Sequence, residues 1–234
     1  MKQKLLFLAL LAFAQPSFGQ FGEYPPFTKW YQNPLGFQPL NLHTSAGIIL
    51  PAVAAAACLL LTDKDTSIIN KITWYDDFGM SWGYYGSETT VYQNNVGLLF
   101  HARKWLALGG EFTSYYVHDA VNNTWGFGLR PFVRFYPVHR EKFRLYFESG
   151  AGIIAFVEKF PQPSGFFGDT RTGTHLNGSP KYGIGAEFNL NPALSLQVGV
   201  RHVHISNGNT WGAENNPGHD SNGFSVGMLW RPGR

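Results

Sequence analysis

Charged side chains are scarce in this chain, and the scarcity narrows the class of protein. Lys, Arg, Asp and Glu together make up 14% of its 234 residues, whereas soluble domains usually contain about 25%. Aromatic residues account for 16%, and there are 27 glycines. Few charges combined with many glycines and aromatic residues favour a β-rich envelope protein over an ordinary soluble domain.

Cysteines and basic clusters are also lacking. Cys58 is the only cysteine, so the chain can form neither an internal disulfide nor a cysteine-based metal site. The net charge is +3, without any cluster of Lys and Arg, which gives no support to a nucleic-acid partner. We therefore expect no nucleic acid, no metal and no cofactor.

Apolar runs long enough to span a bilayer as helices, about 20 residues, are missing as well. The run at 5–13 follows Lys2 and Lys4 and ends in small and turn residues. This pattern predicts a secretory signal peptide over residues 1–19 and an exported mature chain.

Residues 20–77 are predicted to form an N-terminal extension. Within them, the Ala-rich run 48–61 suits a helix of about 14 residues, or roughly 21 Å. Such a helix is too short to span a bilayer. It could plug a barrel lumen, lie along the membrane or pack on the periplasmic end, and the sequence leaves these three positions open.

From about Phe78 to the end, eight runs alternate apolar residues with Gly, polar or charged ones. In the fifth run, Phe143 and Leu145 alternate with Arg144 and Tyr146. Period-two alternation is typical of β-strands with two different faces. We therefore expect an all-β fold, an eight-stranded antiparallel transmembrane β-barrel over residues 78–234.

The second face of these runs distinguishes a membrane barrel from a soluble one. A soluble lipocalin-like barrel would need aromatic residues in the lumen and a Lys-rich outer face. Here the second face carries mostly Gly together with charges of both signs: Glu111, Glu148, Glu187, Arg130, Arg134, Arg144 and Arg201. This mixture fits the narrow polar lumen of a small membrane barrel, where Arg and Glu pair with one another.

The connections between the runs alternate in length. Those at 102–105, 138–142 and 189–192 are short, whereas those at about 117–123, 159–179 and 207–222 are mostly longer. Short periplasmic turns and longer extracellular loops are typical of outer-membrane barrels. The even number of strands would place both ends of the barrel on the periplasmic side.

The seventh run carries polar residues on its apolar face. His204 and Ser206 follow apolar residues at the even positions 194–200, and their Cα atoms should lie about 6–7 Å apart with side chains on one side. Asn207 and Gly208 supply amides for an oxyanion hole, and Asp220 could reach back across the hairpin to His204. A serine nucleophile needs such a base and acid, although the same residues could merely end a strand.

The last hairpin resembles the lipid A 3-O-deacylase family of the PagL type. The resemblance rests on residues 200–208 (VRHVHISNG) and 216–220 (NPGHD), and in coarser form it extends over 78–232. It implies Ser206 as nucleophile, His204 as base and Asp220 as acid, with Asn207 and Gly208 in the oxyanion region. The family's acid is expected to be Glu, so Glu214 in the same loop is the alternative to Asp220. His202 is expected to face lipid as an interfacial histidine without a role, and His219 to be a solvated loop residue.

The resemblance also implies a function, a site of action and partners. The reaction would be hydrolysis of the ester-linked 3-hydroxyacyl chain of lipid A, at the outer leaflet of the outer membrane, where lipopolysaccharide is the partner. A homodimer is a further state to consider. Two alternatives stay open: a non-catalytic barrel, such as an adhesin or structural protein, and another barrel lipid enzyme, such as an acyltransferase or phospholipase.

Overall fold

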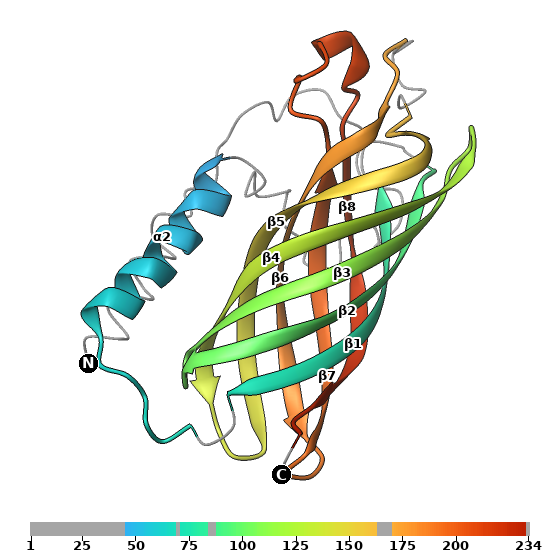
Figure 1. The fold of residues 1–234 in the computed structure, drawn as a ribbon. Helices are drawn as coiled ribbons and strands as arrows, with labels where there is room; N and C mark the ends of the chain where they lie inside the picture. Colours follow the sequence, from blue (N-terminus) through green and yellow to red (C-terminus); the bar gives the residue numbers. More distant parts are fainter. Residues whose placement is uncertain (1–44, 69–70, 84–87, 163–169, 233–234) are drawn as a thin grey trace, which may run out of the picture.

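The computed structural model describes residues 45–68, 71–83, 88–162 and 170–232, which contain one α-helix, a short 3-10 helix (Ala213–Asn215) and eight strands (Figure 1). The predicted signal peptide lies outside these residues. The elements are α2 (Ser45–Leu61), β1 (Ile72–Gly83), β2 (Thr90–Arg103), β3 (Leu106–His118), β4 (Asn123–His139), β5 (Phe143–Phe160), β6 (Thr174–Asn189), β7 (Leu194–Ile205) and β8 (His219–Trp230). Each strand pairs with its sequence neighbours, and β1 also pairs with β8, which closes the barrel.

The predicted fold class is confirmed: the eight strands form one closed antiparallel barrel. The first strand, however, begins at Ile72, six residues before the expected start at Phe78. Alternation continues through this segment, with Trp74 outside and Tyr75 buried inside. Asp76 interrupts the apolar face, where it accepts a hydrogen bond from Asn94 (2.7 Å). Because this carboxylate interrupts the apolar face, the sequence pattern did not show that the strand begins at Ile72.

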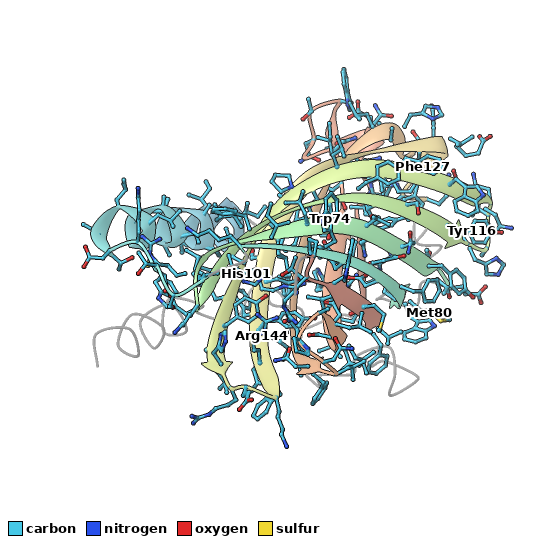
Figure 2. The ribbon with its side chains drawn as sticks, turned by 60° about the horizontal axis from the view of Figure 1, so that its bottom comes forward. Trp74, Met80, His101, Tyr116, Phe127 and Arg144 are labelled. Atoms are coloured by element: carbon cyan, nitrogen blue, oxygen red, sulfur yellow. The ribbon has the colours of Figure 1, made fainter. Side chains whose placement is uncertain are left out.

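The apolar faces of the strands point away from the lumen. Figure 2 shows the barrel with its short-turn end brought forward, with Trp74, Met80, Tyr116 and Phe127 among the labelled outward side chains. Trp74 and Phe127 are about half exposed (45% and 46%). A surface of exposed aromatic and aliphatic side chains suits contact with lipid and would be a liability in water.

A network of ion pairs fills the lumen, as the mixture of Glu and Arg predicted. Its pairs are Glu111 with Arg130 and Lys181, Glu148 with Arg134 and Lys181, Glu187 with Arg134 and Arg144, and Asp77 with Arg201. Every one of these side chains is at most 7% exposed. Lys181 and Asp77 were not predicted as members. Buried charges are stable only when paired in this way.

Glycine keeps the lumen wide enough for these large side chains. A Cβ atom added at Gly109 would lie 2.2 Å from the ring of Phe132, and one at Gly126 would lie 2.5 Å from Phe156. Both aromatic rings therefore lie directly over backbone that must lack a side chain. This explains why the inward face alternates Gly with bulky residues.

The two ends of the barrel differ in their connections. At one end, here called the short-turn end, two to four residues join β2 to β3, β4 to β5 and β6 to β7. At the other, the loop end, residues 119–122, 161–173 and 206–218 lie between strands. The predicted asymmetry is present, and both ends of the barrel sequence lie at the short-turn end (Figure 1).

Helix α2 packs against the outside of the barrel. Its Ala55 and Cys58 lie in one buried cluster with Leu106 and Phe135, and Arg103 donates hydrogen bonds to the carbonyl oxygens of Leu59 (3.2 Å) and Thr62 (2.7 Å). Of the three positions left open by the sequence, the lumen is thereby excluded.

The helix is apolar throughout and carries the chain's single cysteine. Burial raises the pKa of the Cys58 thiol, which is the environment of an unreactive packing residue. No helix within the described ranges is both long enough and apolar enough to cross a membrane.

Candidate active site

The sequence-predicted residues gather at the loop end, on the outward face of β7 and β8. In the β7–β8 register, His204 lies opposite Asp220 and His202 lies opposite Asn222. Residues 202 and 204 share a face with the apolar positions 194–200 because side chains alternate along a strand. The strand pairing itself therefore brings the acid and the histidine together.

His204 and Asp220 are joined directly. The Nδ1 atom of His204 lies 2.8 Å from Oδ1 of Asp220, and the two side chains are only 15% and 18% exposed. A hydrogen bond to an ionised carboxylate places the ring hydrogen on Nδ1, which leaves Nε2 as the acceptor. That is the tautomer in which a histidine can take a proton from a hydroxyl group.

Ser206 lies one residue beyond the end of β7 and is held there by backbone contacts with β6. The Ser206 amide donates to the carbonyl of Gly178 (3.2 Å), and the Gly178 amide donates to the carbonyl of Ser206 (2.8 Å). This isolated bridge continues the strand geometry, so Ser206 stays on the side of His204. Its hydroxyl oxygen accepts a hydrogen bond from the Gly208 amide (3.1 Å).

A tight turn follows the serine. Gly208 and Asn209 both have positive φ values (62° and 61°), and the Thr210 amide donates to the carbonyl of Asn207 (3.1 Å). Two consecutive positive φ values are the mark of a type I′ turn. The turn directs the Gly208 amide back toward the serine oxygen.

The two residues predicted for the oxyanion region differ in their contacts. The Asn207 amide donates to Oδ1 of Asn216 (3.1 Å), whereas the Gly208 amide points at the hydroxyl of Ser206. The Asn207 side chain reaches the carbonyl oxygen of Asn215 (2.7 Å) and so ties the turn to the rest of the loop. Of the two amides, that of Gly208 is the one beside the Ser206 hydroxyl.

The two candidate acids also separate in space. Glu214 lies in a short 3-10 helix, Ala213–Asn215, where its side chain is exposed. Its carboxylate accepts a hydrogen bond from the side-chain amide of the neighbouring Asn215 (3.4 Å). Asp220, in contrast, contacts His204 directly, so the geometry favours it over Glu214.

Two other histidines lie near this cluster, and one of them lies elsewhere than expected. His219, interpreted from sequence as a solvated loop residue, is 7% exposed and packs against the ring of Phe160 (5.2 Å between centroids). This interpretation was wrong because β8 already begins at His219, which places that side chain on the inner face opposite Ile205. His202 does lie on the outer face, but it is 2% exposed and contacts Asp220.

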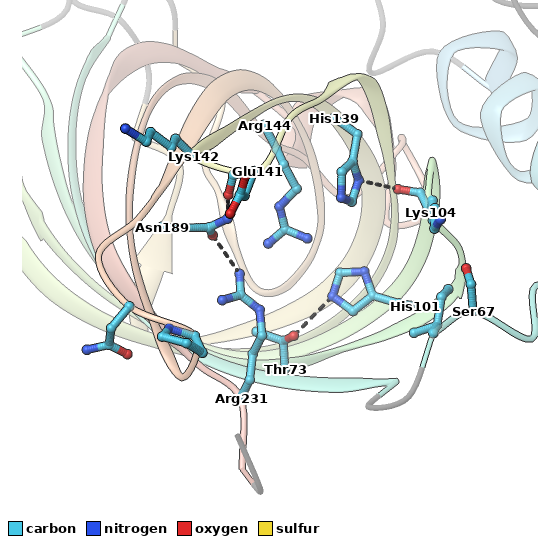
Figure 3. Close-up of a pocket in the computed structure, with 13 residues that line it drawn as sticks. Ser67, Thr73, His101, Lys104, His139, Glu141, Lys142, Arg144, Asn189 and Arg231 are labelled. Atoms are coloured by element: carbon cyan, nitrogen blue, oxygen red, sulfur yellow. Dashed lines mark hydrogen bonds between the residues drawn. The ribbon is translucent and has the colours of Figure 1, made fainter.

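A cavity of about 450 Å³ lies far from this cluster, at the short-turn end (Figure 3). Arg144, Arg231 and His101 project into it, and His101 pairs with Thr73 (3.0 Å). Within the described part of the chain, no group of three or more His, Cys, Asp or Glu residues is arranged to hold a metal ion.

Comparison with known proteins connects this geometry to a family. The family model described as lipid A 3-O-deacylase (PagL) matches residues 101–229, more than half of the chain and including all the residues of the cluster. No curated protein sequence matches the chain.

Solved structures share the barrel architecture. The outer membrane enzyme PagL aligns with 66% of this chain and 97% of its own, at 18% identity and a TM-score of 0.46. Neisserial surface protein A (NspA) aligns with 68% of this chain and 95% of its own, at 10% identity and a TM-score of 0.50. At such identities the structural likeness shows the fold alone.

Proposed function

Because the chain belongs to the lipid A 3-O-deacylase (PagL) family, we propose that it is an outer-membrane serine esterase that removes an ester-linked 3-hydroxyacyl chain from lipid A. The observation that carries this proposal is the 2.8 Å contact between His204 and Asp220 on the outward face beside Ser206. A fold alone does not imply an activity, but this site adds a base in the tautomer that the reaction requires.

The position of the cluster suits a lipid substrate. It lies where the apolar outer face of β7 and β8 meets the loop end, and outer-membrane barrels direct their longer loops to the cell exterior. Lipid A occupies the outer leaflet, so its ester bonds would lie beside this edge of the barrel. A substrate could then approach from the membrane without entering the lumen.

The first half of the reaction transfers the acyl group to the serine. Nε2 of His204 takes the proton from Ser206, and Oγ attacks the ester carbonyl carbon. The tetrahedral intermediate collapses as the bond to the sugar oxygen breaks, and His204 returns the proton to that oxygen. Asp220 stabilises the imidazolium that forms between these two steps.

The second half releases the fatty acid. His204 takes a proton from water, and the resulting hydroxide attacks the acyl-serine carbonyl carbon. The ester bond to Oγ breaks, the proton returns to Ser206, and the 3-hydroxy fatty acid leaves.

The contacts of Ser206 indicate how the site would be set up for attack. Its hydroxyl accepts from the Gly208 amide, and hydrogen bonds between catalytic groups commonly tighten only when substrate binds. As Oγ turns to His204 and the ester, the Gly208 amide becomes available to the developing oxyanion. Removing one such donor from an oxyanion hole typically costs about 10²–10³-fold in rate.

The test is a lipid A mass spectrum. Purified protein in vesicles containing lipopolysaccharide should lower the lipid A mass by one 3-hydroxyacyl group and release one free 3-hydroxy fatty acid per event. Ser206→Ala should reduce the rate by roughly 10⁴-fold or more, since nucleophile removal in serine hydrolases has effects of this order.

A matched control is Ser114→Ala, which changes an outward serine on β3 and should leave the rate unchanged. Unchanged lipid A in the presence of wild-type protein would rule out the deacylase and favour a non-catalytic barrel. A more highly acylated product, or cleavage of phospholipid instead, would identify a different lipid enzyme.

A further inference from the structure

His202 lies beside the proposed triad on a face that is otherwise apolar, so the burial of its polar side chain requires an explanation. It shares the outward face of β7 with Val198 and Val200, yet it is only 2% exposed. Burial of an imidazole away from water costs free energy unless both ring nitrogens have partners. The contacts of this ring therefore indicate what it is for.

The two neighbouring strands, β6 and β8, hold the ring in place. From β6, Tyr182 stacks on it with ring centroids 4.7 Å apart and an angle of 22°. From β8, Asn222 Oδ1 lies 3.1 Å from Nδ1, and Asp220 Oδ1 lies 3.1 Å from Nε2. A ring stacked on its face and held at Nε2 by Asp220 has little freedom to rotate.

One carboxylate oxygen is shared by two histidines. Oδ1 of Asp220 lies 2.8 Å from Nδ1 of His204 and 3.1 Å from Nε2 of His202. The His202 contact comes from the side of the barrel middle, and the His204 contact comes from the loop end, where Ser206 lies. With both donors present, the carboxylate has its orientation set before substrate arrives.

We propose that His202 is a positioning residue for Asp220: through its Nε2 hydrogen it holds the carboxylate in line with His204. This inference rests on the proposed function. Asp220 orients His204, and His204 takes the serine proton. A displacement of the Asp220 carboxylate would therefore also displace Nε2 of His204. Misplacement of catalytic groups by about 1 Å can cost on the order of 10²-fold in rate.

Three substitutions separate positioning from mere packing. His202→Gln places an amide NH₂ where Nε2 stood and so keeps a donor to Asp220. His202→Asn reaches only the place of Nδ1 and keeps the contact with Asn222, and His202→Leu keeps neither. Gln and Asn are alike in polarity and differ in which neighbour they reach, which makes them a matched pair.

The measurement is kcat and KM for release of the 3-hydroxy fatty acid from lipopolysaccharide in vesicles. We expect kcat to fall by about 10–100-fold in the Leu and Asn variants, with KM within about 2-fold of wild type. The Gln variant should keep kcat within about 3-fold. In an Asp220→Asn background, His202→Leu should have little further effect, because the group it positions is already impaired.

Each other outcome overturns the inference. Wild-type kcat in the Leu variant would show that Asp220 needs no second donor, and equal losses in Gln, Asn and Leu would show a packing role. Folding of each variant is checked by the mobility shift of the heated and unheated barrel in detergent gels. If the Leu variant does not fold, the Gln and Asn pair still decides. Inactive wild-type protein would instead refute the proposed function itself.

Discussion

Two polar regions of the barrel wall, the luminal ion-pair network and the outward cluster around Asp220, both contain carboxylates with little exposure to solvent. They differ in the side chains that pair with those carboxylates. In the lumen each carboxylate is matched by guanidinium or ammonium groups, as Glu148 is by Arg134 and Lys181. In the outward cluster Asp220 contacts two histidines. The lumen holds charges of opposite sign that neutralise one another, whereas the outward cluster pairs one carboxylate with imidazole side chains.

Strand β7 carries both regions on adjacent residues. Arg201 points inward and pairs with Asp77 (2.8 Å), while His202 points outward and contacts Asp220 (3.1 Å). Because side chains alternate along a strand, Arg201 stabilises the fold from the lumen, whereas the next residue, His202, lies beside the proposed catalytic residues. The comparison therefore predicts that outward substitutions change activity and that luminal substitutions change stability.

After the loss of Ser206 itself, the largest effect is expected at Asp220. Asp220→Asn keeps the shape of the side chain but removes the charge that stabilises the His204 imidazolium and fixes its tautomer. Loss of this charge in a serine triad lowers kcat by roughly 10³–10⁴-fold. The loss of kcat is measured as the rate of fatty-acid release from lipopolysaccharide. The midpoint of urea unfolding is expected to change little.

Glu214→Gln is the matched control for that substitution. It neutralises the other acid of the same loop, which is exposed and accepts a hydrogen bond from the side chain of Asn215. We expect wild-type activity. A large loss in the Glu214 variant together with an active Asp220 variant would reverse the assignment of the acid.

The next largest effect is expected in the lumen, on the free energy of unfolding. Glu148→Gln removes a buried carboxylate that accepts from Arg134 (2.6 Å) and lies near Lys181 (3.3 Å). Breaking a buried pair leaves an uncompensated charge and typically costs about 3–5 kcal/mol. Urea unfolding of the refolded barrel should show this loss, while activity per folded molecule stays close to wild type.

Glu158→Gln is a suitable comparison because Glu158 is an exposed acid on the same strand, β5. Exposed substitutions usually change stability by no more than about 0.5 kcal/mol. If Glu148→Gln left the free energy of unfolding unchanged and abolished activity, the division between the two regions would be wrong.

Much of the fold could be predicted because the two-residue period of a strand determines which side chains face lipid and which face the lumen. Phe143 and Leu145 turn outward and Arg144 turns inward, as the alternation indicated. The pairing of Glu and Arg followed from their presence on one face. Lys181 was missed as a member of the network, since one charge on a strand does not show which strands lie across the lumen from it.

The site was harder because it depends on strand register and on where a strand begins. Sequence spacing placed His204 and Ser206 on one side, but only the pairing of β7 with β8 sets His204 opposite Asp220 and His202 opposite Asn222. His219 was put on the wrong face because the length of the preceding loop decides where alternation resumes. The contact between His202 and Asp220 follows from this register and left no local signal.

The smallest effect tests whether the turn after Ser206 acts on the chemistry. Gly208 and Gly218 both have positive φ (62° and 71°), and a Cβ at either position would meet no atom within 4 Å. Alanine at each should therefore cost a similar 1–2 kcal/mol of backbone strain, and no steric clash. Only Gly208 donates its amide to Ser206, so only Gly208→Ala should also lower kcat, by a few-fold, as the amide tilts away from the reacting oxygen. Urea unfolding and kcat measured on both variants decide the matter: equal stability losses with unequal kcat would make the turn part of the outward cluster, whereas equal kcat would leave it a structural end to the strand.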